Sequence, residues 1–180
     1  MPWTAPTPPR PLTRPVALRP ADRRHRAVLH NLGQLFRYDL SESYGMLPNE
    51  DGTFNDRMVD RFLAEADPGH RAWLITAAGR LGGFVMTLPI AGGGTTIGAF
   101  FVVRALRRTG VGREAALRTI ALFPGRWRIG FQRYNPGVES FWAGVATEVA
   151  GNEWKVEDGP HPENRPPDTF IEFTTAPAGG

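Results

Sequence analysis

Residues 100–113 read FFVVRALRRTGVGR, and this short stretch combines three kinds of sequence. The aromatic and β-branched run Phe100–Val103 is typical of a strand. The glycines at positions 110 and 112 indicate a turn, and we expect a helix from Glu114 to Phe123 after it. Glycines let main-chain amides approach a ligand closely, and a helix start carries unpaired N–H groups with a partial positive charge. The stretch therefore predicts a loop that binds a pyrophosphate group and is surrounded by arginines.

Two familiar phosphate motifs fit this loop poorly. A Walker A loop requires Gly-Lys-Ser/Thr, and the one lysine of the chain is Lys155. Gly110-Val111-Gly112 with Ala115 does fit the G-x-G-x-x-A pattern of dinucleotide-binding folds. That pattern should follow its strand at once and open a parallel βαβ unit, whereas six residues separate Val103 from Gly110. A third kind of phosphate loop is therefore expected.

The sequence on either side of this stretch predicts further elements from its apolar periodicity and its turns. The expected strands span 16–19, 72–76, 82–88, 96–103, 127–134, 154–156 and 170–174. The expected helices span 23–40, with Asp22 as its cap and Leu35 and Phe36 on its buried side, then 58–63, 114–123, with Leu122 on its buried side, and 138–149. This order predicts an α/β (α+β) domain, with a mixed, mostly antiparallel sheet and helices on both faces.

Length and composition limit the classes of protein to consider. The chain has 180 residues, of which 41% are hydrophobic and 22% charged, as expected for one globular domain. It has no Cys and only four scattered His, so we expect no disulfide, thiol nucleophile or metal site. Residues 1–15 form a proline-rich arm, 16–175 the domain and 176–180 a tail. No apolar run approaches a membrane span and the opening residues lack a signal-like apolar core, so we expect no membrane contact and a cytoplasmic location.

Charge is distributed unevenly along the chain. Residues 104–133 contain eight arginines and a single acid, Glu114, for a formal charge of +7. Residues 134–180 contain two bases and eight acids, for a formal charge of −6. The basic segment suggests an anionic partner, either a phosphate-bearing cofactor or a nucleic acid. The alternative is an arginine-rich face that is simply solvated.

Two motifs together resemble the GNAT acetyltransferase superfamily. Arg107-x-x-Gly110-x-Gly112 resembles its Arg/Gln-x-x-Gly-x-Gly/Ala signature, which binds the pyrophosphate of acetyl-coenzyme A between the fourth strand and the third main helix. About thirty residues further on, the segment 135–142 resembles the Asn-x-x-x-x-x-Phe-Tyr segment that follows the fifth strand of the superfamily. The stretch from Leu35 to Phe170 is also similar to a subgroup of bacterial GNAT proteins. The resemblance covers residues 16–175 and implies a single GNAT-like domain.

The resemblance implies a set of residues that bind acetyl-coenzyme A. Main-chain groups at the end of the fourth strand would hold the pantetheine arm, the loop amides would hold the phosphates, and the segment after the fifth strand would flank the other side. The implied residues are Phe101, Val102, Val103, Arg107, Arg108, Thr109, Gly110, Val111, Gly112, Arg113, Asn135, Phe141 and Trp142. For the aromatic residues among them, packing in the core is the alternative interpretation.

Two departures from the superfamily leave its catalytic groups open. Trp142 stands where the superfamily usually has a tyrosine that protonates the leaving thiolate, and an indole cannot act as that acid. Gly98-Ala99-Phe100 stands where the subgroup tends to carry a carboxylate that acts as a base. Either the thiolate leaves unassisted beside Trp142, or Trp142 is a core residue and Tyr134 donates the proton.

Candidate acceptor residues lie at the end of the first helix, a region that shapes the acceptor pocket in similar proteins. Glu42 or Asp39 could deprotonate an amine, while Tyr38 and Tyr44 could contact it. The alternative is that all four residues are solvated at the helix end.

We therefore expect an acyltransferase that transfers an acetyl group from acetyl-coenzyme A to a primary amine of a small molecule by direct attack. Two alternatives use the same fold. One is an aminoacyl-tRNA-dependent transferase, which the basic segment would suit, and the other is a coenzyme A-binding module without activity. We expect a monomer or a homodimer.

Overall fold

The computed structural model describes residues 15–55, 57–63, 69–133, 135, 137–160 and 168–176. Residues 1–14 of the expected arm, residues 177–180 of the expected tail and Tyr134 lie outside them. The α-helices are α1 (Arg26–Tyr44), α2 (Arg57–Leu63), α3 (Val111–Ala121) and α4 (Val138–Ala150), with short 3-10 helices at η1 (Arg23–His25) and η2 (Arg104–Leu106). The strands are β1 (Val16–Ala21), β2 (Arg71–Ala77), β3 (Arg80–Pro89), β4 (Thr95–Val102), β5 (Gly125–Phe131), β6 (Trp154–Asp158) and β7 (Thr169–Thr175).

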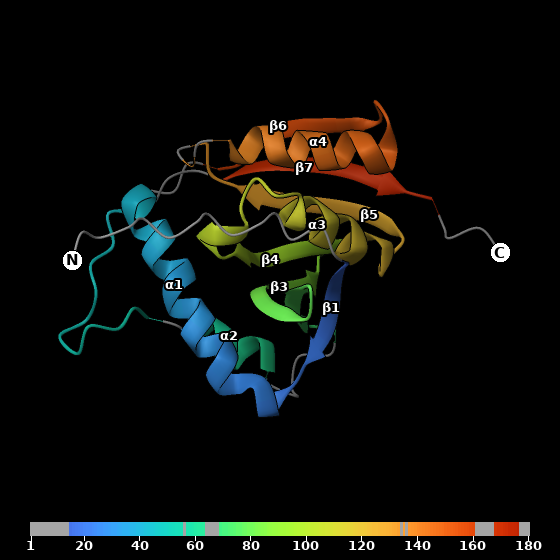
Figure 1. Cartoon of the computed structure of the whole chain (residues 1–180). Helices are drawn as coiled ribbons and strands as arrows, with labels where there is room; N and C mark the ends of the chain where they lie inside the picture. The colour runs from blue at the N-terminus through green and yellow to red at the C-terminus, as the bar shows by residue number, and fades with distance from the viewer. Residues whose placement is uncertain are drawn as a thin grey trace, which may run out of the picture.

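The strands form one seven-stranded sheet in the order β1-β2-β3-β4-β5-β7-β6. Figure 1 shows β5 between β4 and β7 in this order. β2, β3 and β4 form an antiparallel meander, because short turns join β2 to β3 and β3 to β4, and β1 pairs antiparallel with β2. β7 is antiparallel to both β5 and β6. Only β4 and β5 run parallel, since α3 connects them as a crossover. The predicted mixed, mostly antiparallel sheet is confirmed.

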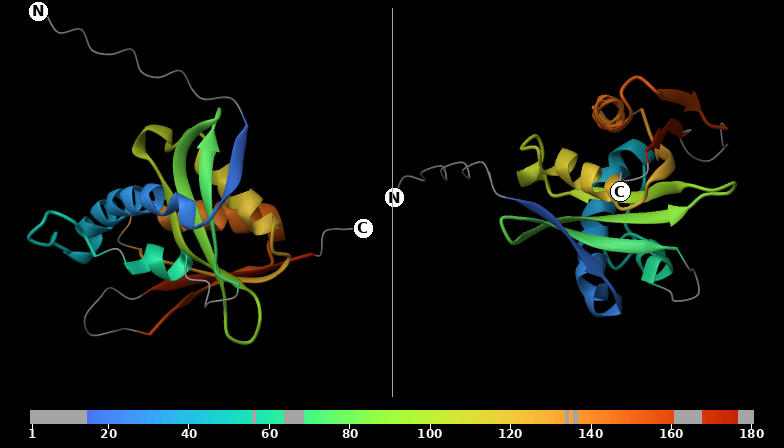
Figure 2. Two further views of the ribbon diagram at one scale, coloured as in Figure 1. Left: turned by 90° about the horizontal axis from the view of Figure 1, so that it is seen from below. Right: turned by 90° about the vertical axis from the view of Figure 1, so that its right-hand side faces the viewer.

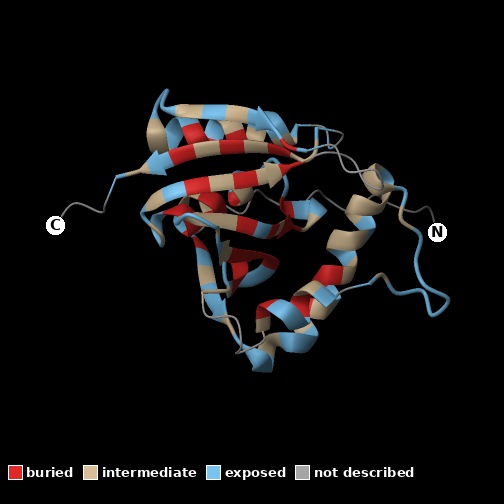
Figure 3. Cartoon of the chain, turned by 180° about the vertical axis from the view of Figure 1, so that it is seen from behind, coloured by how far each residue is buried: buried red, intermediate tan, exposed pale blue. Residues whose placement is uncertain are grey.

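Helices cover both faces of the sheet (Figure 2, right), and a hydrophobic core lies on each face. On one face, α1 and α2 bury Leu29, Leu32 and Phe62 against β2, β3 and β4. On the other face, the side chains of α3 and α4 belong to a core that includes residues of β1 to β5 and of β7. Figure 3 shows the buried residues along the strands and on the helix faces that meet them. Helices on both faces were predicted from the order of elements, and this prediction is confirmed.

Local sequence explains where α1 begins and ends. The Asp22 side chain accepts a hydrogen bond from the Arg24 amide at 2.9 Å and so caps η1, which leads into α1. Gly45, with φ of 61°, ends the helix, four residues later than expected. Two predictions of buried residues were wrong. Leu35 and Leu122 are each 50% exposed, because Leu35 lies on the outer side of α1 and Leu122 follows the last turn of α3.

No helix in the part of the chain that the structure describes is long and apolar enough to cross a membrane.

Candidate functional site

β4 and β5 separate after their first residues. The register places Thr95 opposite Trp127 near the start of each strand, and no later pair of these two described strands is in register. β3, in contrast, remains in register with β4 as far as Gly83 and Val102. The second half of β4 therefore has hydrogen-bonded neighbours on its β3 side and none from β5.

A bulge at Gly98 sets which way β4 presents its side chains. Thr87 faces Ile97 and Met86 faces Ala99, so Gly98 is the extra residue. As a result, Ile97 belongs to the core under α3 and α4, whereas Ala99 belongs to the core under α1 and α2. A β-carbon at Gly98 would lie 2.6 Å from the Phe62 ring, so a glycine is required by the packing of α2 on the bulge.

Main-chain groups of β4 face the side away from β3 at alternate residues. The Val103 amide donates to the Gly82 carbonyl at 2.9 Å, and the Val103 carbonyl accepts from the Leu106 amide at 2.9 Å. The prediction that Val103 offers main-chain groups to a cofactor was therefore wrong. Because main-chain groups alternate in a strand, those of Phe101 point to β3 as well, and those of Val102 and Phe100 point to the open side. Phe100 is thus a candidate site residue that the sequence analysis missed.

The loop after β4 presents amides that the chain does not use. Arg108 (φ 61°) and Gly110 (φ 89°) adopt left-handed conformations, and α3 begins at Val111, three residues earlier than expected. The first amide of this region with an acceptor is that of Glu114, which donates to the Gly110 carbonyl at 3.0 Å. Among the described residues, nothing accepts a hydrogen bond from the main-chain N–H groups of residues 108–113. Unpaired amides in left-handed turns at a helix start are suited to an anion.

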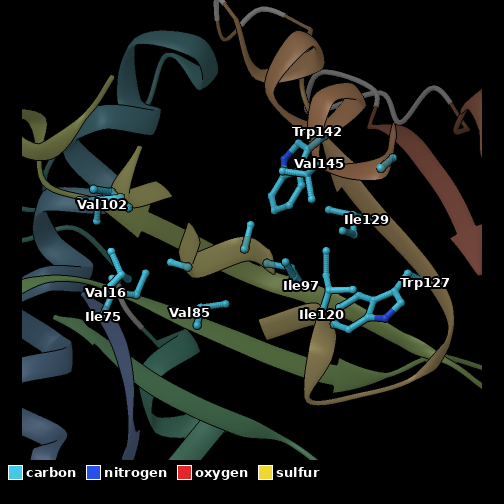
Figure 4. Close-up of a cluster of buried hydrophobic side chains, with 14 of the residues drawn as sticks. Val16, Ile75, Val85, Ile97, Val102, Ile120, Trp127, Ile129, Trp142 and Val145 are labelled. Atoms are coloured by element: carbon cyan, nitrogen blue, oxygen red, sulfur yellow. The ribbon is translucent and has the colours of Figure 1, made fainter. Parts of the chain in front are cut away.

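Aromatic rings lie beside this loop. The ring of Phe100 lies 5.9 Å from that of Phe141 and 5.5 Å from that of Trp142. A β-carbon at Gly112 would lie 3.6 Å from the Phe141 ring, so the start of α3 lies directly against it. Phe141 is half-buried, whereas Trp142 is 4% exposed and packs with Val145 in the core (Figure 4). The prediction that Trp142 contacts the cofactor was therefore wrong, because the core encloses its indole.

Asp39 connects α1 to the loop after β4. Its carboxylate accepts from the Arg104 guanidinium at 2.8 and 3.0 Å and also forms an ion pair with Arg107. The hydrogen bond to Asp39 raises the pKa of Arg104. Arg107 also donates to the Val102 carbonyl at 2.9 Å, and its guanidinium lies 5.7 Å from the Phe101 ring centroid. Because both oxygens of Asp39 accept from guanidinium groups, Asp39 positions the loop, and the prediction that it acts as a base loses its support.

Most arginines of the basic segment are neutralised in the fold. Arg113 pairs with Glu148, and Arg118 pairs with Glu114 at 2.7 Å. The remaining pairs are Arg126 and Arg128 with Glu172, and Arg133 with Glu139 and Asp158. Of the eight arginines, Arg108 is the one without an ion-pair partner among the described residues. The acidic carboxyl-terminal segment supplies most of the partners.

The other predicted residues lie around the end of α1 and the start of α4. Tyr38 is 62% exposed, Glu42 is exposed, and Tyr44 is half-buried in the last turn of α1. Asn135 is exposed, and its main chain forms the turn that leads into α4. Tyr134, the other predicted catalytic residue, lies outside the described residues. In the described part of the chain, no three His, Asp or Glu side chains gather in a way that could hold a metal ion.

Two adjoining cavities lie on the α1–α2 face. The first, of about 540 Å³, is bounded by α1, by the segment that joins α1 to α2, and by the start of α2. The second, of about 390 Å³, lies between α2 and the strands and reaches Gly98 on β4. Arg57 and Met58 line both cavities. Their volumes fall within the range of small-molecule sites.

Comparison with solved structures identifies the class of fold. No protein-family model matches the sequence, and no curated protein sequence does. An acetyltransferase from Thermus thermophilus matches with a TM-score of 0.67 at 18% identity, covering 88% of this chain and 96% of that one. An aminoglycoside acetyltransferase solved in complex with coenzyme A matches with a TM-score of 0.65 at 12% identity, covering 89% and 95%.

A GNAT-family acetyltransferase from Staphylococcus aureus matches with a TM-score of 0.61 at 10% identity, covering 89% of this chain and 99% of that one. The chain therefore has the fold of acetyltransferases. More particularly, it has the GNAT fold, as its two sequence motifs predicted.

Proposed function

We propose that the chain is a GNAT-type N-acyltransferase that uses acetyl-coenzyme A and a primary amine. The observation that carries the proposal is the separation of β4 from β5 next to unused amides at residues 108–113. An open strand edge provides hydrogen-bonding groups for an extended, amide-containing arm, and the amides at the start of α3 suit a pyrophosphate. The match to an acetyltransferase in complex with coenzyme A supports the same cofactor.

The residues present fit this cofactor. The amides of residues 108–113 and the unpaired Arg108 side chain would bind its phosphates. The outward-facing groups of Phe100 and Val102 would bind the pantetheine arm, although the Val102 carbonyl already accepts from Arg107. The rings of Phe100 and Phe141 would flank the arm beside Gly112. Acetyl-coenzyme A would supply the thioester, whose sulfur is a fair leaving group near neutral pH.

In the proposed reaction, the amine attacks the thioester carbonyl directly. Holding the two reactants together makes the attack effectively unimolecular. An outward-facing amide of β4, from Phe100 or Val102, would polarise the carbonyl oxygen. Glu42 is the proposed base, because the ion pairs of Asp39 leave Glu42 as the exposed carboxylate among the acceptor candidates.

Tyr134 is the proposed proton donor to the thiolate. The burial of Trp142 supports this choice over the alternative in which the thiolate leaves beside its indole. Tyr134→Phe should then lower turnover by at least about tenfold without changing the affinity for coenzyme A. This lower limit lies below the contribution of about 10²–10⁴-fold that a general acid typically makes. Trp142→Phe should mainly lower the melting temperature, by leaving a cavity in the core.

The test is to incubate the protein with acetyl-coenzyme A and a panel of amines and to measure free thiol. Thiol release that depends on an amine, together with N-acetylated product in the mass spectrum, is the expected result. Binding of coenzyme A with no transfer to any amine would favour the non-catalytic module. Activity that ribonuclease abolishes would favour the tRNA-dependent alternative, which the ion-paired basic segment does not support.

A further inference from the structure

The cavity of about 540 Å³ beside α1 has a cationic lining. Its polar lining residues are Arg37, Asn49, Asn55 and Arg57, and no described residue that lines it is acidic. Methionine, leucine and phenylalanine side chains form the rest of the wall. A cavity with two guanidinium groups and an apolar wall suits a small molecule that has one anionic group and an apolar part.

One nitrogen of the Arg37 guanidinium lacks the hydrogen-bond acceptor that a buried donor normally has. This atom, Nε, is buried and makes no hydrogen bond. Arg57 likewise forms no ion pair with a described residue, although its main-chain amide donates to the Asn55 side chain at 3.3 Å. A buried polar atom without a hydrogen bond is costly, so the Nε of the half-buried Arg37 favours an acceptor supplied by a ligand, which the exposed Arg57 can contact as well. Carboxylates and phosphates match the planar set of donors of a guanidinium best.

The cationic cavity leads towards the proposed reaction centre. Arg57 and Met58 also line the second cavity, whose lining includes Gly98 at the bulge of β4. Gly98 precedes Phe100 by two residues, which is about 7 Å along a strand. A molecule whose anionic group contacts Arg37 and Arg57 could therefore extend its amine towards the outward-facing groups of β4.

Resting on the proposed function, we infer that the acceptor is an amine that also carries an anionic group, a carboxylate or a phosphate, bound by Arg37 and Arg57. Polycationic amines such as spermidine or aminoglycosides would meet like charge there, so they are poor acceptors. The acceptor class is therefore that of amino acids and amino phosphates.

The first experiment measures binding and requires no activity. N-acetylglycine, a carboxylate without a free amine, and inorganic phosphate are titrated separately into the full chain by calorimetry. We expect one of the two anions to bind, and its affinity to fall about tenfold in Arg37→Gln and in Arg57→Gln, the loss of a charge-assisted contact. Arg19→Gln on the exposed part of β1 removes the same charge elsewhere and should leave binding unchanged.

The anion that binds distinguishes a carboxylate from a phosphate. Arg37→Lys, which retains the charge but loses the planar donor set, should bind between wild type and Arg37→Gln. Coenzyme A affinity, measured on every variant, shows that the fold is intact. If neither anion binds, or if both glutamine variants bind as wild type does, the inference is overturned.

The second experiment compares matched acceptors by thiol release. Glycine is compared with glycinamide, phosphoethanolamine with ethanolamine, and all four with spermidine. We expect kcat/KM to be at least tenfold higher for one anionic member than for its uncharged counterpart, and Arg57→Gln to abolish that preference mainly through KM. Equal or better use of glycinamide, ethanolamine and spermidine would overturn the inference and leave the proposed function standing. Absence of transfer to every amine would overturn the proposed function, while the binding experiment would still decide whether the anion site exists.

Discussion

The arginines that follow β4 and the arginines of the α1–α2 region differ in their partners. Seven of the eight arginines within residues 104–133 pair with carboxylates from α1, α3, α4, β6 and β7. Arg37, Arg57 and Arg61 form no ion pair with a described residue, and each lines a cavity. The formal charges of the two segments in the sequence suggest the opposite, namely that the first segment is the one with free positive charge. Residues 104–133 carry +7, whereas residues 37–61 contain three arginines and six acids.

The formal charge of a sequence segment therefore does not show which of its charged side chains remain without an ion-pair partner in the folded protein. Two of the six local acids are engaged elsewhere, because Asp39 pairs with Arg104 and Arg107, and Asp60 pairs with Arg26 and His30. Neither of these carboxylates pairs with Arg37, Arg57 or Arg61. The acidic end of the chain neutralises much of the basic segment in turn. A local excess of charge is thus a weak guide to partners unless the tertiary ion pairs are known.

The largest expected effect is on the amide loop, where binding depends on the main chain. Gly110→Asp should weaken coenzyme A binding by more than about tenfold, because a non-glycine residue is strained at positive φ and a carboxylate repels phosphate. A β-carbon at Gly110 would meet no atom within 4 Å, so Gly110→Ala isolates the strain and should weaken binding less. Calorimetric titration of coenzyme A into both variants separates the effect of backbone strain from the effect of the added negative charge. An affinity of Gly110→Asp equal to that of wild type would show that this loop does not bind phosphate.

The next effect tests the connection between the two regions. Asp39→Asn releases Arg104 and Arg107, so we expect about fivefold weaker coenzyme A binding and a melting temperature lower by about 3–6 °C. The pH dependence of turnover should not change. A loss of 10²–10⁴-fold in turnover, with normal affinity, would instead assign Asp39 as the general base. Steady-state kinetics over a pH series, with Glu42→Gln in parallel, separates the two roles.

A smaller effect compares a free arginine with a paired one in the same segment. Arg108→Gln removes the arginine without a partner among the described residues and should weaken coenzyme A binding about threefold to tenfold. Arg118→Gln removes a guanidinium that pairs with Glu114 at 2.7 Å, and we expect no change in affinity. Equal losses in both variants would mean that general charge, and not the loop position, controls binding.

The smallest effect concerns the ion pairs that fix α2 on α1. Hydrogen bonds from Arg26 and His30 lower the pKa of Asp60 from its ordinary value of 3.8. A lowered pKa in the fold means that Asp60 adds stability above about pH 4 and that this stability is lost as the pH falls through the lowered value. Because the pair is exposed, Asp60→Asn should lower the melting temperature by only about 1–3 °C at pH 7. Melting curves of both proteins should converge as the pH falls below the lowered pKa of Asp60, and a difference that persists there would contradict an electrostatic origin.

The loop before α3 was the most predictable part of the candidate site. Its glycines, its place between strand and helix, and its spacing to the segment at Asn135 are all local features, and the described fold agrees with them. The outward-facing residue Phe100 was missed, because the bulge at Gly98 reverses the alternation of β4 and no local signal marks a bulge before a partner strand is known. Trp142 was misplaced for a similar reason, since helical periodicity does not say which of two adjacent aromatic residues faces the core.

The sequence by itself determined the order of strands and helices, the antiparallel meander and the start of the loop at Gly110. These depend on apolar periodicity, on turn residues and on the conformational freedom of glycine, all of which act within a few residues. Only the tertiary structure decided the charge of the site. Ion pairs such as Arg107 with Asp39, and the position of Arg37 and Arg57 in a cavity, join residues that lie far apart in the chain. They form because the packing of α1, α2 and the sheet brings these side chains close together, and the order of residues along the chain does not encode that proximity.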